Sequence, residues 1–321
     1  MTKKLLKGPF IKSSSSSEKI MKSIIITLIP LIIFTFIHEG LLPYLNSKVD
    51  LYQMSSPILT IITTTITIII TEYIYHLISH RQSNSSSPIK DPQNIIMGLI
   101  LGLIIPNTAP LYLIIIASII ASITKSLSHT FHHYLFNPII VGMIPIIILT
   151  NNQVTEPPNI EVASIILSII YLIIFIYLCY KQAIKWQISL SYIITIILAI
   201  TFITITNHLS ITYIIYHIIA GSLIFSAIFL ATDSLTSPTT KYGRVIYGIS
   251  LGIITLILYY LIPFTNLLSS PLIAIFIMNL LVKPIDKLAI QINFNRPCQR
   301  ASIAIIVIIA IIVTSIISYQ L

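Results

Sequence analysis

The chain has 321 residues, of which 56% are hydrophobic and 8% are charged, and its net charge is +9. A soluble domain carries about 25% charged residues, so the composition excludes an ordinary soluble domain and predicts a polytopic, all-α membrane protein. The basic residues are scattered between apolar runs, which argues against a nucleic-acid partner and for determinants of membrane topology. The two cysteines, Cys179 and Cys298, do not have metal-ligand spacing, and we expect no metal site.

The apolar runs predict about ten transmembrane helices, and their order suggests two sets of five. After a tail at 1–22, the first half (23–150) contains predicted spans at 23–38, 57–79, 94–105, 109–124 and 136–150. A short outer loop at 151–159 leads to the second half (160–283), with spans at 160–180, 187–206, 211–231, 245–262 and 269–282. The remainder, 284–321, is an inner segment followed by an apolar run at 302–318, which either spans the bilayer as an extra helix or lies along it.

The distribution of basic residues orients this topology. With a cytoplasmic N-terminus, all 18 Lys and Arg residues except Lys48 fall on the inner side, as the positive-inside rule requires. Five spans per half place the second half upside down relative to the first, and such inverted repeats commonly hold a site at their interface. The corresponding stretches 97–110 and 220–238, which begin within the third span of each half, both end in a Thr/Pro turn. The Gly98–Gly102 pair in the first of them permits close helix approach.

Four stretches carry a family resemblance: TDSLTSPTTKYGRVIYGISLG at 232–252, LFNPIIVG at 135–142, KQAIKWQISLSYI at 181–193 and GLILGLIIPNTAPLYL at 98–113. In order and spacing, from about residue 8 to residue 290, the chain resembles the subunit designated D in the Rnf/Rsx ion-translocating electron transport complex. The subunit designated B in the sodium-pumping NADH:quinone reductase belongs to the same family. The resemblance implies ten spans in two inverted halves, a multi-pass protein of the cell inner membrane, and partners among the other integral and peripheral subunits.

The resemblance also implies a cofactor, because family members carry FMN linked through its phosphate to a threonine in the outer loop between the halves. Here that loop is short, and Thr155 is the corresponding hydroxyl. The sequence departs from the family motif at Leu149, Asn152 and Val154, where aspartate, serine and alanine belong. Thr155 is therefore either the site of covalent flavin attachment or an ordinary loop hydroxyl.

These features lead to two hypotheses of function. The first is a membrane subunit that carries or positions FMN and couples electron transfer to Na⁺ or H⁺ movement, without being a complete enzyme by itself. The alternative is a flavin-less, transporter-like or structural scaffold subunit of the same membrane assembly.

A further departure from the family pattern is the histidine-rich stretch with His129, His132 and His133. We expect these residues to form a polar cluster at the membrane interface rather than a metal site.

Three further residues are candidates for chemistry. Glu72 lies within the second span, where a carboxylate is costly and faces the bundle interior or a cavity. It lines the ion path or pairs with a tyrosine or histidine such as Tyr73 or His76. Asp233 and Thr236 lie in the polar hairpin that follows the eighth span. They either shape a flavin-side cavity or form a turn in which Asp233 satisfies backbone donors.

Overall fold

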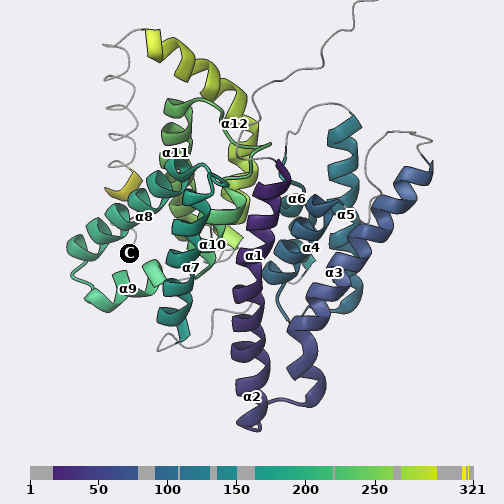
Figure 1. Ribbon diagram of the computed structural model, residues 1–321. Coiled ribbons are helices and arrows are strands. Elements are labelled where there is room, and N and C mark those ends of the chain that lie inside the picture. The colour runs from purple at the N-terminus through teal and green to yellow at the C-terminus, as the bar shows by residue number, and fades with distance from the viewer. Residues whose placement is uncertain are drawn as a thin grey trace, which may run out of the picture.

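The apolar, isoleucine-rich segments form helices that continue through most of the chain (Figure 1). The computed structural model describes residues 17–78, 91–107, 109–130, 136–149, 163–219, 221–262, 269–294, 313–315 and 317. The first half contains α1 (Ser17–Thr35), η1 (Phe36–Leu41), α2 (Leu42–Leu45), α3 (Leu51–Ile78), α4 (Pro92–Ile104), α5 (Leu111–Thr130) and α6 (Pro138–Leu149). The second half contains α7 (Ala163–Tyr180), α8 (Trp186–Thr206), α9 (Ile211–Ile219), α10 (Gly221–Phe225), η3 (Ser226–Leu230), α11 (Lys241–Leu261) and α12 (Ser269–Phe294).

Five of these helices are long and apolar enough to cross a membrane: Glu18–Leu45, Leu51–Ile78, Leu111–Ser128, Trp186–Thr206 and Lys241–Leu261. The first two have 28 residues each. At 1.5 Å per residue this is about 42 Å, well beyond the hydrocarbon thickness of about 30 Å. Shorter apolar helices lie at Pro92–Ile104, Pro138–Leu149 and Ile165–Tyr180. The prediction of an all-α, multi-pass membrane protein is confirmed among the described residues.

The helix bounds differ from the sequence prediction in several places. The first helix begins at Ser17, inside the predicted tail. Within the predicted single span at 211–231, helix is described at Ile211–Ile219 and Gly221–Phe225, and it continues into the π-helix η3 at Ser226–Leu230. The last helix continues through Pro284 to Phe294, well past the predicted end at 282, because proline bends a helix without always ending it. The predicted run at 302–318 lies almost entirely outside the described residues.

Glycines of α4 permit a close helix contact in the first half, where α3 packs against α4 and α5. A Cβ atom added at Gly98 would lie 2.6 Å from the Cα atom of Thr65, and one at Gly102 would lie 2.7 Å from the Cα atom of Ile61. Across the same contact, the Thr64 hydroxyl donates a hydrogen bond of 2.9 Å to the Gly98 carbonyl. The close approach expected from the Gly98–Gly102 spacing is therefore confirmed.

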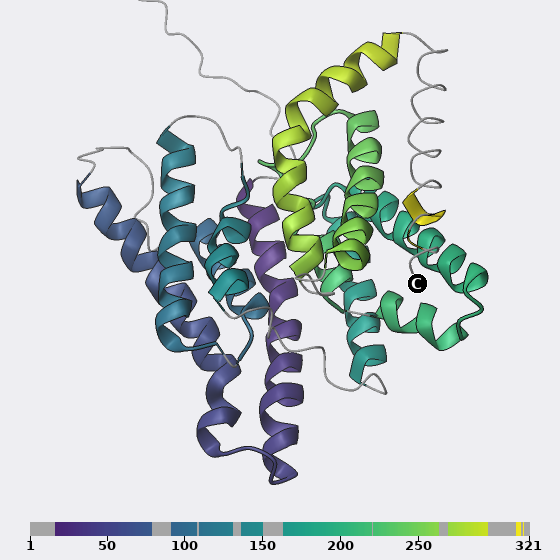
Figure 2. The same cartoon turned by 180° about the vertical axis from the view of Figure 1, so that it is seen from behind.

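In the second half, α11 packs against α8 and α12, again with glycine at the contact. A Cβ atom at Gly248 would lie 2.7 Å from the Ile188 carbonyl oxygen, and one at Gly252 would lie 2.9 Å from the Thr195 Cβ atom. The two halves lie side by side in both views, and they meet where α1 contacts α7 and where α6 contacts α12 (Figures 1 and 2).

Candidate functional site

The interface between the halves is built around buried asparagines. Asn137 precedes α6, and its side-chain amide donates a hydrogen bond of 3.5 Å to the carbonyl of Leu230, at the end of η3. The side-chain amide of Asn279 on α12 is oriented so that both its nitrogen and its oxygen have partners. In this orientation the amide oxygen accepts a hydrogen bond of 3.0 Å from the backbone N–H of Asn137. Beside them, the rings of Phe136 and Phe276 stack with centroids 4.6 Å apart. The Phe-Asn-Pro segment thus joins both α12 and the helix that leads into the polar hairpin.

The polar hairpin, residues 232–240, begins directly after η3 and folds on its own side chains. Asp233 accepts a hydrogen bond of 2.9 Å from the Thr236 hydroxyl, and the backbone N–H groups of Ser234 and Leu235 also donate to its carboxylate. Burial raises the pKa of the Asp233 carboxyl above its ordinary value, although these hydrogen bonds oppose the rise. The predicted turn-forming role of Asp233 is confirmed, while a role for Asp233 and Thr236 in cofactor binding stays a prediction.

Asp286 of α12 anchors the far end of the hairpin. Its carboxylate accepts hydrogen bonds from the backbone N–H groups of Thr239 and Thr240, at 3.0 and 3.1 Å, and from their hydroxyls, at 3.1 and 2.6 Å. Burial by itself raises the pKa of the Asp286 carboxyl, but these hydrogen bonds outweigh it and hold the pKa below its ordinary value. Thr240 also caps α11, because its hydroxyl oxygen accepts from the Gly243 N–H at 3.1 Å.

Lys185, just before α8, holds the hairpin from the opposite side. Its amine donates to the Ser234 and Ser237 carbonyls, at 3.2 and 3.0 Å, and to the Ser237 hydroxyl at 2.8 Å. Burial, reinforced by the positive charge of Arg244, lowers the pKa of the Lys185 amine to about 8, against the opposing pull of Asp233 and Asp286. The loop before α8, the hairpin and α12 are therefore tied together at one end of the molecule.

Glu72 of α3 faces α5. Its carboxylate accepts hydrogen bonds from the hydroxyls of Ser122, at 3.3 Å, and Ser126, at 2.9 Å. Tyr73, one of the neighbours considered from the sequence, is 48% exposed. Glu72 thus joins two of the five long apolar helices through hydroxyl groups.

Next to Ser126, Lys125 forms a second polar contact in the first half. The Lys125 side chain is 4% exposed, and its amine lies 2.9 Å from a carboxylate oxygen of Asp91. It also donates to the side-chain oxygen of Asn94, which is fully buried. Asp91 in turn caps α4 by accepting from the Gln93 N–H at 3.0 Å. A buried ammonium needs such partners, so this ion pair fixes the start of α4 against α5.

The structure separates the predicted site residues into different groups. Glu72 belongs to the contact between α3 and α5, and Asp233 and Thr236 belong to the hairpin. Thr155 and the rest of the outer loop lie outside the described residues, as do the side chains of His129, His132 and His133. From the sequence alone Lys185 is only a determinant of topology, and no local pattern marks Asp286 as the residue that anchors the hairpin.

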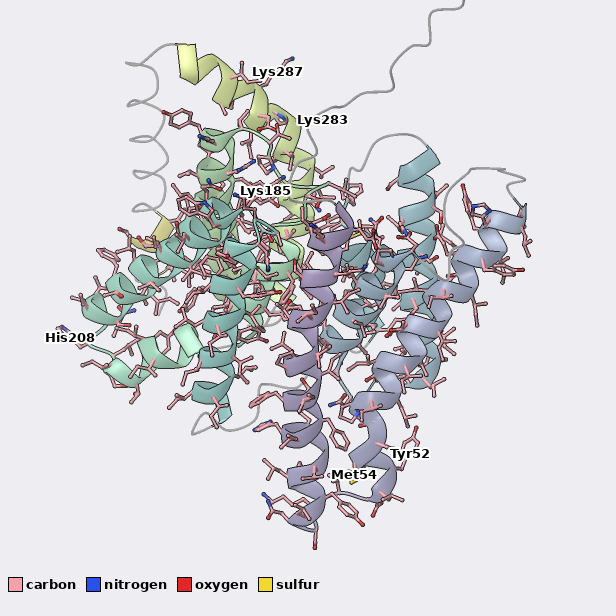
Figure 3. All side chains as sticks on the ribbon, in the orientation of Figure 1. Tyr52, Met54, Lys185, His208, Lys283 and Lys287 are labelled. Carbon is pink, nitrogen blue, oxygen red and sulfur yellow. The ribbon has the colours of Figure 1, made fainter. Side chains whose placement is uncertain are left out.

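Charge gathers at the hairpin end of the molecule. Lys185, Lys283 and Lys287 lie toward one end, whereas Tyr52 and Met54 lie at the opposite end (Figure 3). This separation agrees with the predicted inner placement of the three lysines. The long apolar helices define a polytopic helical membrane protein, and the hairpin with its partners forms a polar junction toward one end of it.

Comparison with known proteins identifies the family. The chain belongs to the NQR2, RnfD, RnfE family, whose model matches residues 4–165 and 160–295. The chain is similar to the subunit designated D of the Na(+)-translocating ferredoxin:NAD(+) oxidoreductase complex of Acetobacterium woodii. The two are 37% identical over 83 residues, which are 26% of this chain and 24% of the relative. It is 36% identical over 78 residues to the subunit designated D in an ion-translocating oxidoreductase complex of Methanosarcina acetivorans, over 24% of each chain. To the corresponding subunit of Escherichia coli it is 28% identical over 111 residues, which are 35% of this chain and 31% of the relative. The alignments thus span about a quarter to a third of these relatives.

Proposed function

We propose that this chain is an integral membrane subunit of a multi-subunit, ion-translocating electron transport complex. The observation that carries the proposal is the family match, which extends over residues 4–165 and 160–295 and so includes both halves. The names of the relatives from three organisms, each the same lettered subunit of such a complex, support the same conclusion. Its partners are the other integral and peripheral subunits, and its apolar helices contact membrane lipid.

The proposed architecture is ten spans in two inverted halves, and the pattern of helix contacts supports it. In each half the second helix contacts the fourth and the fourth contacts the fifth, as in α3–α5–α6 and α8–α11–α12. The first helix also contacts the third, as in α1–α4 and α7–α10. Between the halves, the two first helices contact each other (α1–α7), and so do the two fifth helices (α6–α12), as expected for halves related by a two-fold axis. Five crossings per half would make that relation an inversion across the membrane.

The proposed orientation puts the polar hairpin and the N-terminus on the cytoplasmic side of the cell inner membrane. The gathering of Lys185, Lys283 and Lys287 at the hairpin end supports it, because Lys and Arg favour cytoplasmic loops (Figure 3). The outer loop containing Thr155 then faces the opposite side of the membrane. The hairpin, which is tied to α8, α11 and α12, is the natural inner contact surface for partner subunits.

The proposed cofactor is FMN, joined through its phosphate to the Thr155 hydroxyl. This part rests on the resemblance of the outer loop to the flavinylated segment of the family. A bound flavin would supply the electron transfer chemistry, and the chain would contribute its position and its electrostatic surroundings. The second candidate function, a flavin-less scaffold of the same assembly, is favoured by the departures from the family motif at Leu149, Asn152 and Val154.

Glu72 is the proposed ion-path residue within the first half. Ionisable side chains inside membrane spans mark ion and proton pathways. The Glu72 carboxylate and the two serine hydroxyls that contact it present oxygen atoms together between α3 and α5. Oxygen ligands suit a hard cation such as Na⁺, and a carboxylate can equally exchange a proton.

Affinity purification of the tagged chain from its native membranes tests the assignment. We expect the other subunits of an ion-translocating oxidoreductase to co-purify, and vesicles containing that complex to take up Na⁺ or H⁺ when supplied with a soluble electron donor. Deletion of this chain should abolish uptake, and the wild-type chain should restore it. Purification without such subunits, or uptake that survives the deletion, would contradict the proposal.

A further inference from the structure

The ion pair between Lys125 and Asp91 lies beside the carboxylate of Glu72 in the first half. Ser126 of α5 donates to Glu72 of α3 at 2.9 Å. The amine of the preceding residue, Lys125, lies 2.9 Å from a carboxylate oxygen of Asp91, just before α4. We propose that the charges of Lys125 and Asp91 set how tightly Glu72 binds a cation and how strongly it discriminates against divalent cations. The inference rests on the proposed role of Glu72 in the ion path.

The three charged groups of this region leave one net negative charge. The charges of Lys125 and Asp91 cancel, which leaves the carboxylate of Glu72. Its hydrogen-bond partners, Ser122 and Ser126, are neutral, and among the residues that the structure describes no lysine or arginine forms an ion pair with Glu72. A carboxylate in a membrane span is costly until a cation balances its charge. One univalent cation completes this balance, whereas a divalent cation leaves an excess positive charge.

Burial keeps these charges effective over a distance. The Lys125 side chain is 4% exposed, and Ser122 and Ser126, which separate it from Glu72, are buried. Salt therefore screens little of the field between the ion pair and Glu72. Since consecutive Cα atoms are 3.8 Å apart, the chain of contacts through Ser126 places the Lys125 amine within about 15 Å of the Glu72 carboxylate.

The size of the electrostatic effect depends on the charge of the bound cation. At an effective dielectric constant of about 20, a unit charge about 15 Å away changes the affinity for a univalent cation about sixfold. It changes the affinity for a divalent cation about 40-fold, because the interaction energy doubles. Lys125 by itself repels a cation at Glu72 and Asp91 by itself attracts one, so the intact pair has little net effect.

A purely structural ion pair would respond differently to substitution. Removal of either partner would then disturb the packing of α4 against α5, and cation binding would weaken in both cases. Under the electrostatic role the two substitutions act in opposite directions. Lys125→Gln leaves the charge of Asp91 uncompensated and tightens binding, whereas Asp91→Asn leaves the charge of Lys125 uncompensated and weakens it.

Ion uptake by membrane vesicles that contain the intact complex tests this role. Two quantities are measured: the Na⁺ concentration that gives half-maximal uptake and the Ca²⁺ concentration that halves uptake. For a complex that carries H⁺, the Ca²⁺ series is used alone. The variants are Lys125→Gln, Asp91→Asn and the double variant. Lys241→Gln is the control, because it removes the same charge from an exposed residue at the start of α11.

We expect Lys125→Gln to lower the Na⁺ value about sixfold and the Ca²⁺ value about 40-fold, and Asp91→Asn to raise both by the same factors. The double variant and Lys241→Gln should stay within about twofold of the wild type. Misfolding cannot tighten binding, so the result for Lys125→Gln decides the question by itself where Asp91→Asn fails to assemble. Shifts in the same direction in both single variants, or no shift in Lys125→Gln, would overturn the proposal.

Glu72→Gln separates this inference from the proposed function on which it rests. Wild-type uptake in Glu72→Gln would remove Glu72 from the ion path, and the inference would fall with it. Loss of uptake in Glu72→Gln, together with unshifted Na⁺ and Ca²⁺ values in Lys125→Gln, would overturn only the role of the ion pair.

Discussion

Asp286→Asn removes the charge that anchors the polar hairpin. In the wild-type chain the two carboxylate oxygens accept four hydrogen bonds, two from each of Thr239 and Thr240. Asparagine keeps one acceptor oxygen and turns an NH₂ group toward the remaining donors. The substitution therefore both weakens the interactions that it keeps and leaves one of the two backbone N–H groups without a partner.

The magnitude follows from these contacts. A hydrogen bond to a charged group contributes about 1.5–3 kcal/mol, and partial exposure of Asp286 places its bonds near the lower end of that range. Two lost or weakened bonds, with water replacing part of each, give a net loss of about 2 kcal/mol in the local stability of the hairpin. This corresponds to about a 30-fold increase in the opening equilibrium.

Amide hydrogen exchange of the purified complex measures that opening. We expect the amides of Thr239, Thr240 and Gly243 to exchange about 30-fold faster in Asp286→Asn. Asp50→Asn is the control, because Asp50 is an exposed residue before α3. Thr239→Val removes one hydroxyl partner of the same carboxylate and leaves the Thr240 cap of α11 in place, so its effect and that of Asp286→Asn should not add. Unchanged exchange in Asp286→Asn, or additive effects in the double variant, would refute the anchoring role.

Three further predictions concern packing, charge and the ion path. Gly98→Ala should lower stability by about 1–3 kcal/mol in thermal unfolding, since its Cβ atom would lie 2.6 Å from the Thr65 Cα atom; an unchanged melting temperature would contradict the packing. In competitive acylation, the rate at which the Lys185 amine reacts should reach half of its maximum near pH 8, with exposed Lys283 as the reference for the reagent. A midpoint above pH 10 would contradict the burial of Lys185. Because the folded state then loses this proton first, the free energy of unfolding should rise between about pH 8 and pH 10.5. Glu72→Gln keeps an acceptor for Ser126 but removes the charge, so the complex should assemble and lose most ion uptake; wild-type uptake would exclude Glu72 from the path.

The helical class of the fold was predictable because it depends on apolar run length, which the sequence displays directly. The close approach at Gly98 was predictable too, since small residues four apart share one face of a helix. The π-helix η3 was not, because the apolar residues continue through Ser226–Leu230 without proline or glycine. A π-helix such as η3 depends on the surroundings into which the helix packs rather than on local propensity.

For the candidate site, too, the sequence predicted the polar hairpin itself but not the residues that hold it in place. The turn itself was predictable from Asp233, Thr236 and Pro238, which are typical turn residues. Its anchors were not, because Lys185 and Asp286 lie about 50 residues away on either side and have no local pattern that points to it. The contact between Asn137 and Leu230 joins residues 93 positions apart, and only the folded chain brings the two motifs together.

Flavin attachment at Thr155 is the most direct test of the proposed electron-transfer role. The chain is purified from cells that contain an active flavin transferase, denatured, separated on a gel and illuminated for flavin fluorescence. Thr155→Ala is compared with Thr150→Ala, a matched loss of a hydroxyl from the residue just before the outer loop. The account predicts a fluorescent band in the wild type and in Thr150→Ala, and none in Thr155→Ala. A wild-type chain without fluorescence would contradict the flavin-carrying role and leave the scaffold function in its place.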